Sequence, residues 1–385
     1  MSKPRLLVLT EWFLPGYRAG GPIRSTGNLV AALHTEFDIS VVTSDRDLGM
    51  SRPYADIPAN EWTSHGGTAR IMYLSPDRQT LGTVGRLASE ADAECVYLNS
   101  MFSTRFSLPA LLARWRGRIG KRMVVAPRGE LLPGALRYKT MKKTGFLSLL
   151  RASGVLHGLH FHATDAQERE SIVSRLGVPP VRVTTLANVP EPVAADPRPV
   201  EKSADAVRLL FLSRVSPKKN LAFLLERLRE VPATVGVTLT IGGPQEDVAY
   251  WDRCSRLMHG LPKHVRVEAI GAVSHEQVRP LIERHHAFVL PTFGENYGHS
   301  IVEALGTGRP VIISDRTPWR NLVVQGAGWD LPLEEPAEFT RAIVAVARLD
   351  QTGFDRMARA ALAYAGRLAD TDALKSGYRA LFAPR

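Results

Sequence analysis

The sequence predicts an α/β protein with two doubly wound domains, each built on a parallel β-sheet, that face a central cleft. Short apolar runs rich in Val, Leu and Ile alternate with segments of helical period along all 385 residues. Runs this apolar are typical of strands buried on both faces, as in parallel sheets covered by helices. A proline-rich break near the middle leaves two parts of ordinary domain size.

The expected elements follow from where the apolar period changes. In the first half of the chain, the pattern predicts strands at residues 6–10, 40–43, 95–98 and 123–126. In the second half, it predicts strands at 209–213, 238–242, 287–290 and 311–313. Helical period is clearest at 25–33, 108–114, 166–176, 222–228 and 277–285. Ser25 or Thr26 is expected to cap the first of these helices.

Residues 188–207 contain four prolines and show no apolar periodicity, which is typical of a linker. We therefore expect an N-terminal domain at residues 1–190, a linker at 191–207 and a C-terminal domain at 208–365. A cleft between two domains of similar size is a common place for a ligand site.

The composition restricts the class of protein. A hydrophobic content of 44% and a charged content of 23% exclude a wholly disordered chain. The two cysteines cannot form a disulfide framework and fit a reducing compartment. No stretch approaches the roughly 18 apolar residues of a spanning helix, and the first apolar run is shorter than that of a signal peptide. We expect a cytoplasmic protein, free or peripheral on the inner face of a membrane.

The net charge of +11 is concentrated in one segment. Between Arg105 and Arg151 there are twelve basic residues and one acid, Glu130. Such a segment attracts an anionic partner, for example nucleic acid, acidic lipid or a phosphorylated substrate. A solvated basic face without a partner is the alternative. The stretch from Lys139 to Leu150 is basic and then apolar, so it fits either a segment lying on acidic lipid or a core helix with solvated flanks.

Residues 291–312, PTFGENYGHSIVEALGTGRPVI, place Glu295 and Glu303 eight positions apart across a helix expected to start near Tyr297. The N-terminus of a helix carries unpaired backbone N–H groups and suits an anion such as a diphosphate, which Gly298 allows to approach closely. Glu303 is then placed to accept both hydroxyls of a ribose, and Glu295 faces a sugar at the other end. The spacing alone also fits a loop acid and a surface helix residue.

This stretch resembles the E-x7-E signature of the family 4 retaining glycosyltransferases, which have the GT-B fold of two Rossmann-like domains. The usual Glu-Gly-Phe-Gly reads Glu295-Asn296-Tyr297-Gly298 here, and asparagine tolerates unusual backbone angles better than most residues. The resemblance covers nearly the whole chain, and it implies that residues 366–385 form a helical tail crossing back to the first domain. It also implies a catalytic, sugar-positioning role for Glu295 and donor contacts by Asn296, Tyr297, Gly298 and Glu303.

A second stretch, FLSRVSPKKN at 211–220, looks like the Arg-x4-Lys pattern of the same family. The resemblance places Arg214 and Lys219 on the donor diphosphate as catalytic residues. Two fixed cations stabilise the negative charge that grows on the diphosphate as its bond to the sugar breaks, so no metal ion is required. An ordinary exposed basic turn is the alternative.

Four further residues resemble the donor side of this family. Gly20 and Gly21 look like its glycine-rich first loop, which closes over the donor phosphates and the acceptor, and Arg24 just after them is an acceptor-side candidate. A plain turn is the alternative, and the dinucleotide fingerprint is absent. Gly243 and Val273 match strand-end loops that hold the nucleotide, mostly through backbone.

The acceptor side is less specific. Arg128 and Glu130 follow a strand, where the resemblance implies that the acceptor half faces the cleft. Many family members have a histidine near the reacting sugar after the preceding strand, and this chain has Asn99 and Ser100 there. The contribution of the first domain to catalysis is therefore open. The three nearby histidines lack a cysteine pair or a helix-spaced acid, so a structural role is favoured over a metal site; they are His157, His160 and His162.

Taken together, the residues and the resemblance predict a retaining, metal-independent hexosyltransferase that needs no cofactor. Its donor would be a UDP- or GDP-sugar, and its acceptor a saccharide or lipid-linked hydroxyl in cell-surface polysaccharide synthesis. A nucleotide-sugar 2-epimerase of the same fold is one alternative. A basic nucleic-acid-binding protein is another, disfavoured because aromatic residues are scarce in the basic segment and no nucleic-acid motif is present.

Overall fold

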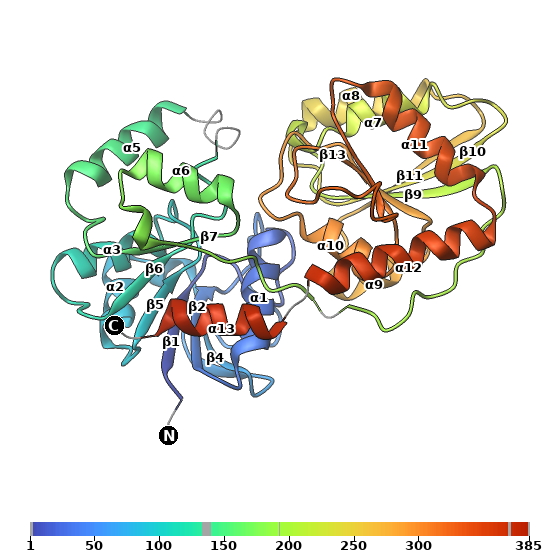
Figure 1. The fold of residues 1–385 in the computed structure, drawn as a ribbon. Coiled ribbons are helices and arrows are strands. Elements are labelled where there is room, and N and C mark those ends of the chain that lie inside the picture. Colours follow the sequence, from blue (N-terminus) through green and yellow to red (C-terminus); the bar gives the residue numbers. More distant parts are fainter. Residues whose placement is uncertain (1–2, 133–139, 192, 369–370, 384–385) are drawn as a thin grey trace. The chain divides into compact units, whose positions relative to one another are not determined.

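The computed structural model describes residues 3–132, 140–191, 193–368 and 371–383. The chain divides into two compact units: Met1–Val189 with Thr371–Arg385, and Pro190–Asp370. Each unit is a β-sheet covered by helices (Figure 1). Within the described ranges, no helix has both the length and the apolar character that crossing a membrane requires.

The sheet of the first unit has the strand order β3-β4-β2-β1-β5-β6-β7-β8. Its pairs are parallel except β3 with β4, which is antiparallel and departs from the all-parallel expectation. The strands are β1 (Arg5–Leu9), β2 (Asp38–Ser44), β3 (Trp62–His65), β4 (Ala69–Leu74), β5 (Cys95–Leu98), β6 (Arg122–Val125), β7 (His160–Ala163) and β8 (Val183–Thr185). The helices are α1 (Gly21–Leu33), α2 (Leu81–Glu90), α3 (Ser107–Trp115), α5 (Thr140–Ala152), α6 (Ala166–Leu176) and α13 (Thr371–Phe382).

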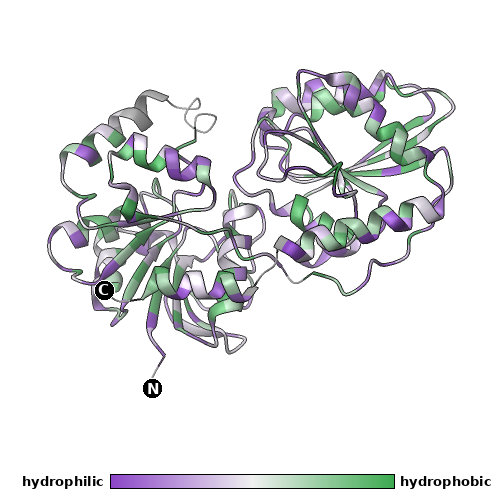
Figure 2. Cartoon of the chain, in the orientation of Figure 1, coloured by the Kyte–Doolittle hydropathy of each residue, from purple (hydrophilic) through white to green (hydrophobic). Residues whose placement is uncertain are grey.

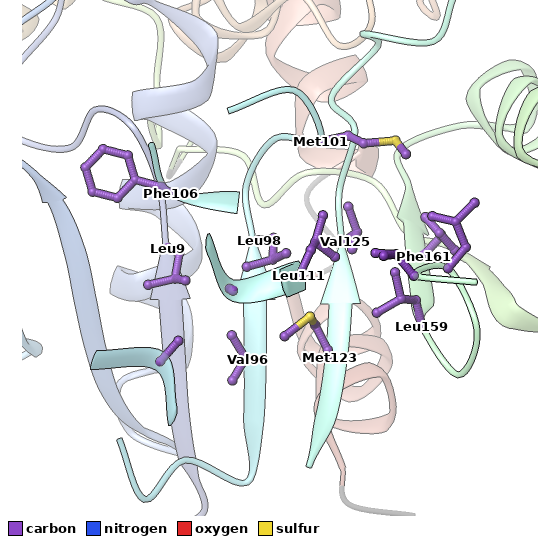
Figure 3. Packing of buried hydrophobic residues seen from close by; sticks show 14 of the residues in the cluster. Leu9, Val96, Leu98, Met101, Phe106, Leu111, Met123, Val125, Leu159 and Phe161 are labelled. Carbon is purple, nitrogen blue, oxygen red and sulfur yellow. The ribbon is translucent and has the colours of Figure 1, made fainter. Parts of the chain in front are cut away.

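Helices cover both faces of this sheet, which explains why its central strands β1, β5 and β6 are mostly apolar. Leu7 and Leu9 of β1 pack with α2, α3 and α6, in the cluster that Figure 3 shows. Leu6 and Val8 pack on the opposite face with α1 and α13. Successive side chains of a strand point to opposite faces, so burial of both faces requires an unbroken apolar run.

The sheet of the second unit has the order β11-β10-β9-β12-β13-β14, with parallel pairing throughout. Its strands are mostly hydrophobic and hydrophilic residues lie on the outer helices (Figure 2). The strands are β9 (Ala206–Leu212), β10 (Gly236–Gly242), β11 (Val265–Gly271), β12 (Ala287–Leu290), β13 (Val311–Ser314) and β14 (Gly328–Leu331). The helices are α7 (Leu221–Leu228), α8 (Val248–His259), α9 (His275–Glu283), α10 (His299–Gly306), α11 (Pro336–Arg348) and α12 (Gln351–Leu368).

All eight expected strands are present, with ends shifted by no more than three residues. The pattern missed six strands, and four of them, β3, β8, β11 and β14, are the edges of the two sheets. An edge strand is covered less completely and needs no continuous apolar run; β11, for example, is largely exposed. The other two, β4 and β7, lie next to an edge.

The expected cap of the first helix is wrong. Helix α1 begins at Gly21, and Gly20 occupies the N-cap position with a left-handed φ of 69°. Ser25 and Thr26 lie inside the helix, where their hydroxyls donate to the carbonyl of Pro22 at 3.1 and 2.9 Å. Both side chains bond back along the helix instead of capping it.

The segment expected to be a linker is attached to the second unit. Lys202 is buried, and its ammonium donates to the carbonyls of Ser203, Ala347 and Leu349 at 2.6–2.8 Å. The fully buried Arg309 donates to the carbonyl of Arg198 at 2.8 Å. Strand β9 already begins inside this segment, and Pro192 lies outside the described residues. Beyond the expected end at 365, α12 continues to residue 368, and α13 packs in the first unit.

Candidate functional site

The candidate donor site lies where the strand order of the second sheet reverses. Strand β9 is followed along the chain by β10 and β11 on one side of the sheet, and β12 by β13 and β14 on the other. In open α/β sheets, ligands bind at this switch point, outside the carboxyl ends of the strands. The loops that leave β9 and β12 there are residues 213–220 and 291–298. The first carries Arg214 and Lys219, and the second carries Glu295, the first acid of the other motif.

These two loops are joined by an ion pair between Lys219 Nζ and Glu295 Oε1. Both side chains are shielded, with 13% and 11% of their surface exposed. Backbone contacts hold the loops in register, since the carbonyl of Lys218 accepts from the Phe293 N–H at 2.8 Å and from the Thr292 hydroxyl at 3.1 Å. The structure therefore brings together two of the three predicted catalytic residues.

The third, Arg214, pairs with Glu246 in the loop that follows β10. The Val215 N–H donates to Pro244 O at 2.8 Å, and the Glu246 N–H donates to Val215 O at 3.2 Å, so the two loops run side by side. About 42% of the Arg214 side chain is exposed, which leaves it accessible to an anion. Sequence reasoning missed Glu246, although it lies in a strand-end loop three residues after Gly243.

Three lysine and arginine side chains therefore gather near the end of β9. Burial lowers the pKa of Lys218, and the neighbouring Lys219 and Arg214 lower it further, while Glu295 acts in the opposite direction. A concentration of positive charge around a partly shielded loop is suited to a polyanionic ligand.

The second motif forms the start of α10, two residues later than expected. Gly298 has a φ of 76°, and a Cβ there would lie 2.8 Å from Ile301 Cδ1, so glycine is required. The Tyr297 carbonyl accepts a 2.6 Å hydrogen bond from the Trp319 indole, which fixes the backbone before the helix. Glu303 is part-buried in α10, and its charge adds to burial in raising the pKa of Tyr297.

Asn296 lies between Glu295, which pairs with Lys219, and Tyr297, whose carbonyl is bound by Trp319. Its φ is not positive, so the tolerance of asparagine for unusual backbone angles is not what this position uses. Its side-chain oxygen Oδ1 is buried and has no hydrogen-bond partner within the part of the chain that the structure describes.

Gly243 and Val273 occupy neighbouring strand-end loops. Gly243 has a φ of 134°, and a Cβ there would lie 2.0 Å from Ser213 O, so the glycine lets this loop cross the end of β9. Its N–H donates to Gly271 O at 2.6 Å. Val273 packs on Gly242, whose ideal Cβ would lie 3.1 Å from a Val273 methyl. Gly243 therefore lies against the Arg214 loop, and Val273 lies against the neighbouring Gly242.

In the first unit, Arg128 is the centre of a polar network at the carboxyl edge of β1, β5 and β6. Its guanidinium donates to Asn99 Oδ1 at 2.6 Å, to Tyr97 Oη at 2.7 Å and to Asn188 Oδ1. Asn99 in turn donates to Thr10 Oγ1 at 3.2 Å. Arg128 has a φ of 56°, a conformation that costs energy in a non-glycine residue. The predicted pair Asn99 and Arg128 is thus in direct contact.

The other acceptor-side candidates are placed differently. The Glu130 carboxylate accepts from the Ser100 hydroxyl at 2.7 Å and from the Met101 and Phe102 N–H groups, so it supports the turn after β5. Gly20 and Gly21 begin α1, and Arg24 lies part-buried in its first turn. Asn99 Nδ2 donates to the carbonyl of Pro22 at 3.3 Å, which connects the start of α1 to the Arg128 network.

Sequence reasoning missed Glu11, two residues after β1. Burial raises the pKa of its carboxyl, whereas Arg105 and a hydrogen bond with Ser103 lower it. The sequence signal was present, because the residue lies just past the carboxyl end of an apolar strand, where ligand sites of such sheets form.

One of the three histidines, His162, and one arginine of the basic segment, Arg114, make structural contacts. His162 is fully buried, and its ring nitrogens bond to Tyr97 Oη at 2.8 Å and Leu186 O at 2.9 Å. Arg114 donates to the carbonyls of Lys121 and Gly158. Arg137 and Lys139 lie outside the described residues, as do the side chains of Lys142, Lys143 and Phe146.

Two α/β units, each with a largely parallel sheet, are the architecture of the GT-B fold. The Anabaena protein HepE, solved in complex with UDP and glucose, superposes with a TM-score of 0.68 at 14% identity, over 98% of this chain and 99% of that one. WaaG, a glycosyltransferase involved in lipopolysaccharide biosynthesis, superposes with a TM-score of 0.65 at 12% identity, over 98% and 99%. At these identities the likeness establishes the fold.

The second unit can be assigned more closely. Residues 206–348 match the family model described as Glycosyl transferases group 1, so this unit carries a domain of that family, consistent with the family 4 resemblance of its motifs. The chain is similar to one component of the phosphatidylinositol N-acetylglucosaminyltransferase of Arabidopsis thaliana, with 28% identity over 141 residues. That match spans 36% of this chain and 31% of the relative, under a third of its length.

Proposed function

We propose that the chain is a retaining glycosyltransferase that moves a sugar from a UDP- or GDP-sugar to an acceptor hydroxyl. The observation that carries this proposal is the Lys219–Glu295 pair, which joins both motif loops at the switch point of the group 1 domain. HepE, which has the same fold, was solved with UDP and glucose, and this supports a nucleotide-sugar donor.

The reaction needs charge stabilisation at the diphosphate. As the bond between the sugar carbon and the phosphate oxygen breaks, its electron pair moves to that oxygen. Lys219 and Arg214 stabilise the new negative charge, which is the kind of fixed electrostatic contribution that accelerates such steps most. The acceptor oxygen attacks on the face the phosphate leaves, and its proton passes to the phosphate oxygen. Because the acceptor bonds to the sugar on the face that the phosphate leaves, the configuration is retained, and this step uses no protein nucleophile.

The acids and glycines position the donor around this centre. Glu295 accepts hydrogen bonds from the sugar, and its contact with Lys219 keeps both groups in the required orientation. Glu303 accepts from the ribose hydroxyls. Tyr297, Gly298, Gly243 and Val273 contribute backbone and shape. Because the cations already supply the positive charge that a divalent ion would bring, the proposal includes no metal and no cofactor.

The acceptor binds at the carboxyl edge of the first sheet. Asn99 and Arg128 offer fixed donors there, held by mutual hydrogen bonds, and Arg24 and the Gly20–Gly21 turn lie at the start of α1, which Asn99 contacts. Glu130 acts on this site by holding the turn after β5. Glu11 is a further carboxylate at this edge.

We propose a saccharide or lipid-linked acceptor in cell-surface polysaccharide synthesis, with the chain on the cytoplasmic side of a membrane. The name of the Arabidopsis relative includes the lipid phosphatidylinositol, and WaaG is described as involved in lipopolysaccharide biosynthesis. Both names support a lipid-linked acceptor. The basic segment supports attraction to anionic lipid. Vesicle sedimentation at low salt tests this: preferential binding to anionic liposomes is expected, and equal binding to neutral ones contradicts it.

A nucleotide-sugar panel tests the activity itself. A ligand present at 100 times its dissociation constant stabilises the folded chain by about 2.7 kcal/mol, so one class of UDP- or GDP-sugars is expected to raise Tm clearly. That donor should then lose its sugar to a saccharide acceptor with retained configuration. Conversion into its 2-epimer without acceptor would favour the epimerase, and a gel shift with nucleic acid at physiological salt would favour the nucleic-acid alternative.

A further inference from the structure

Strand β11 is an open edge of the second sheet. It pairs with β10 on one side, and within the described ranges no strand pairs with it on the other. Arg266, Glu268 and Ala269 are exposed, and Ile270 has 40% of its surface accessible. Successive residues of a strand point to opposite faces, so both faces of β11 are uncovered there. Proteins block such an edge or pair it with another chain, because its backbone groups are unsatisfied.

The backbone groups that β11 presents at this edge can be identified. The Val237 N–H of β10 donates to the carbonyl of His264 at 2.9 Å, so His264 directs its backbone groups toward β10. This direction alternates along a strand, and Val265, Val267 and Ala269 therefore direct theirs to the open edge. The N–H of Val265 already donates within its own chain. The edge thus offers both groups of Val267 and Ala269 and the carbonyl of Val265.

The side chains make this edge complementary to itself. Arg266 and Glu268 have opposite charges and lie on one face of β11, two residues apart. When a second copy pairs antiparallel about Val267, Arg266 lies opposite the partner's Glu268, and Glu268 opposite the partner's Arg266. These are non-hydrogen-bonded positions, where side chains approach most closely and opposite charges stabilise the pair. Centring the pair on Arg266 or on Glu268 would place like charges together, so the charges select one register.

We propose that two copies of this chain associate through β11, antiparallel about a two-fold axis at Val267, and form one continuous sheet. Each Val267 N–H then donates to the carbonyl of the partner's Val267, and each Ala269 N–H to the carbonyl of the partner's Val265. A two-fold dimer of this kind uses the same patch on both subunits. A contact of one strand pair is small, and small interfaces associate weakly. The dissociation constant is therefore expected in the micromolar range, and it does not depend on the proposed sugar transfer.

Sedimentation velocity of the full chain at about 5 to 500 µM tests the association. The unsubstituted chain should move from monomer toward dimer across this range. Arg266→Glu places two acids opposite each other, and Glu268→Arg places two bases there. Each should raise the dissociation constant roughly tenfold or more, because both cross-strand pairs change from attraction to repulsion. The double variant Arg266→Glu/Glu268→Arg restores opposite charges and should return the constant to within about threefold of the original.

Arg348→Glu is the matched control. Arg348 is exposed on α11, which packs on β9, β13 and β14, and this change alters the net charge as much as Arg266→Glu does. It should leave the association unchanged. Charged residues on an edge strand can also serve to keep copies apart. An unsubstituted chain that stays monomeric at every concentration would show that role and overturn the inference, as would a double variant that dimerises no better than the single ones. Neither result affects the transferase proposal, since no donor or acceptor enters the experiment.

Discussion

The ammonium of Lys219 contacts the carboxylate of Glu295, and this contact joins the loop after β9 to the loop after β12. The two residues are 76 positions apart in the chain, so the pair exists because parallel β9 and β12 place their carboxyl ends side by side. Both groups are shielded from solvent. Shielded pairs in a defined geometry orient their members, and removing one partner leaves the other charge without compensation.

Substitution of Lys219 tests the role of this cation. Lys219→Ala should lower kcat for sugar transfer by roughly 10²- to 10³-fold, because a fixed charge that stabilises the leaving diphosphate is lost. Initial-rate kinetics at saturating acceptor measure the change. The control is Lys263→Ala, since Lys263 is an exposed lysine of the same unit. If Lys219→Ala transfers sugar as fast as Lys263→Ala, Lys219 does not stabilise the leaving diphosphate.

Gly243 provides a test of the loop geometry. Gly243→Ala should reduce the free energy of unfolding by about 3 kcal/mol, because its Cβ would collide with Ser213 O and its φ of 134° is unfavourable for alanine. Gly260→Ala is the matched change: φ is not positive there, and the nearest atom would lie 3.6 Å away. Urea unfolding compares the two. A Gly243→Ala chain as stable as Gly260→Ala would mean that the loop takes another path.

The buried His162 predicts a loss of stability in acid. Burial, and secondarily Arg128, lowers its pKa from 6.5 to about 3. Because the unfolded chain takes up this proton below about 6.5 and the folded chain does not, stability is full above that pH and falls as pH decreases toward 3. His162→Gln should reduce the slope of unfolding free energy against pH between 6 and 4 by about 1.4 kcal/mol per unit. Burial lowers the pKa of His285 and His286 to about 4, so part of the slope remains. If the pH dependence of the unfolding free energy is the same in His162→Gln as in the unsubstituted chain, the low pKa of His162 is contradicted.

Arg128 tests the acceptor side. Arg128→Gln should raise the KM for the acceptor by roughly 10- to 100-fold, because a guanidinium oriented by three neutral acceptors is removed. Arg118→Gln removes one exposed charge from the same basic segment and should leave this KM unchanged. If both variants raise it equally, the effect is one of overall charge, and Arg128 has no specific contact with the acceptor.

The sequence alone predicted the central strands and the loops that follow them, because both depend on local patterns of residues. Central strands are covered on both faces, so their apolar runs marked β1, β5, β9 and β12 closely, and the motif loops that follow them could be placed at strand ends. The contact between Lys219 and Glu295 could not be predicted from spacing alone. This contact forms because β9 and β12 are neighbours in the sheet, and the strand order could not be predicted from the sequence pattern.

The features that sequence reasoning missed depend on long-range packing. Edge strands such as β11 carry no continuous apolar run. Lys202 looked like a linker residue, yet its three hydrogen bonds reach carbonyls 145 and 147 residues away as well as its neighbour. Thr26 looked like a cap because the glycine that takes this position has no side chain to signal it. Glu246 became a candidate once Arg214 was seen to contact it.

The most direct test of the central claim is a crystal structure of the chain with the UDP- or GDP-sugar that stabilises it most. The account predicts that the diphosphate oxygens lie about 2.7–3.2 Å from Lys219 Nζ and the Arg214 guanidinium, with Glu295 on the sugar and Glu303 on the ribose. A donor bound away from the ends of β9 and β12, or one whose diphosphate contacts neither cation, would contradict it.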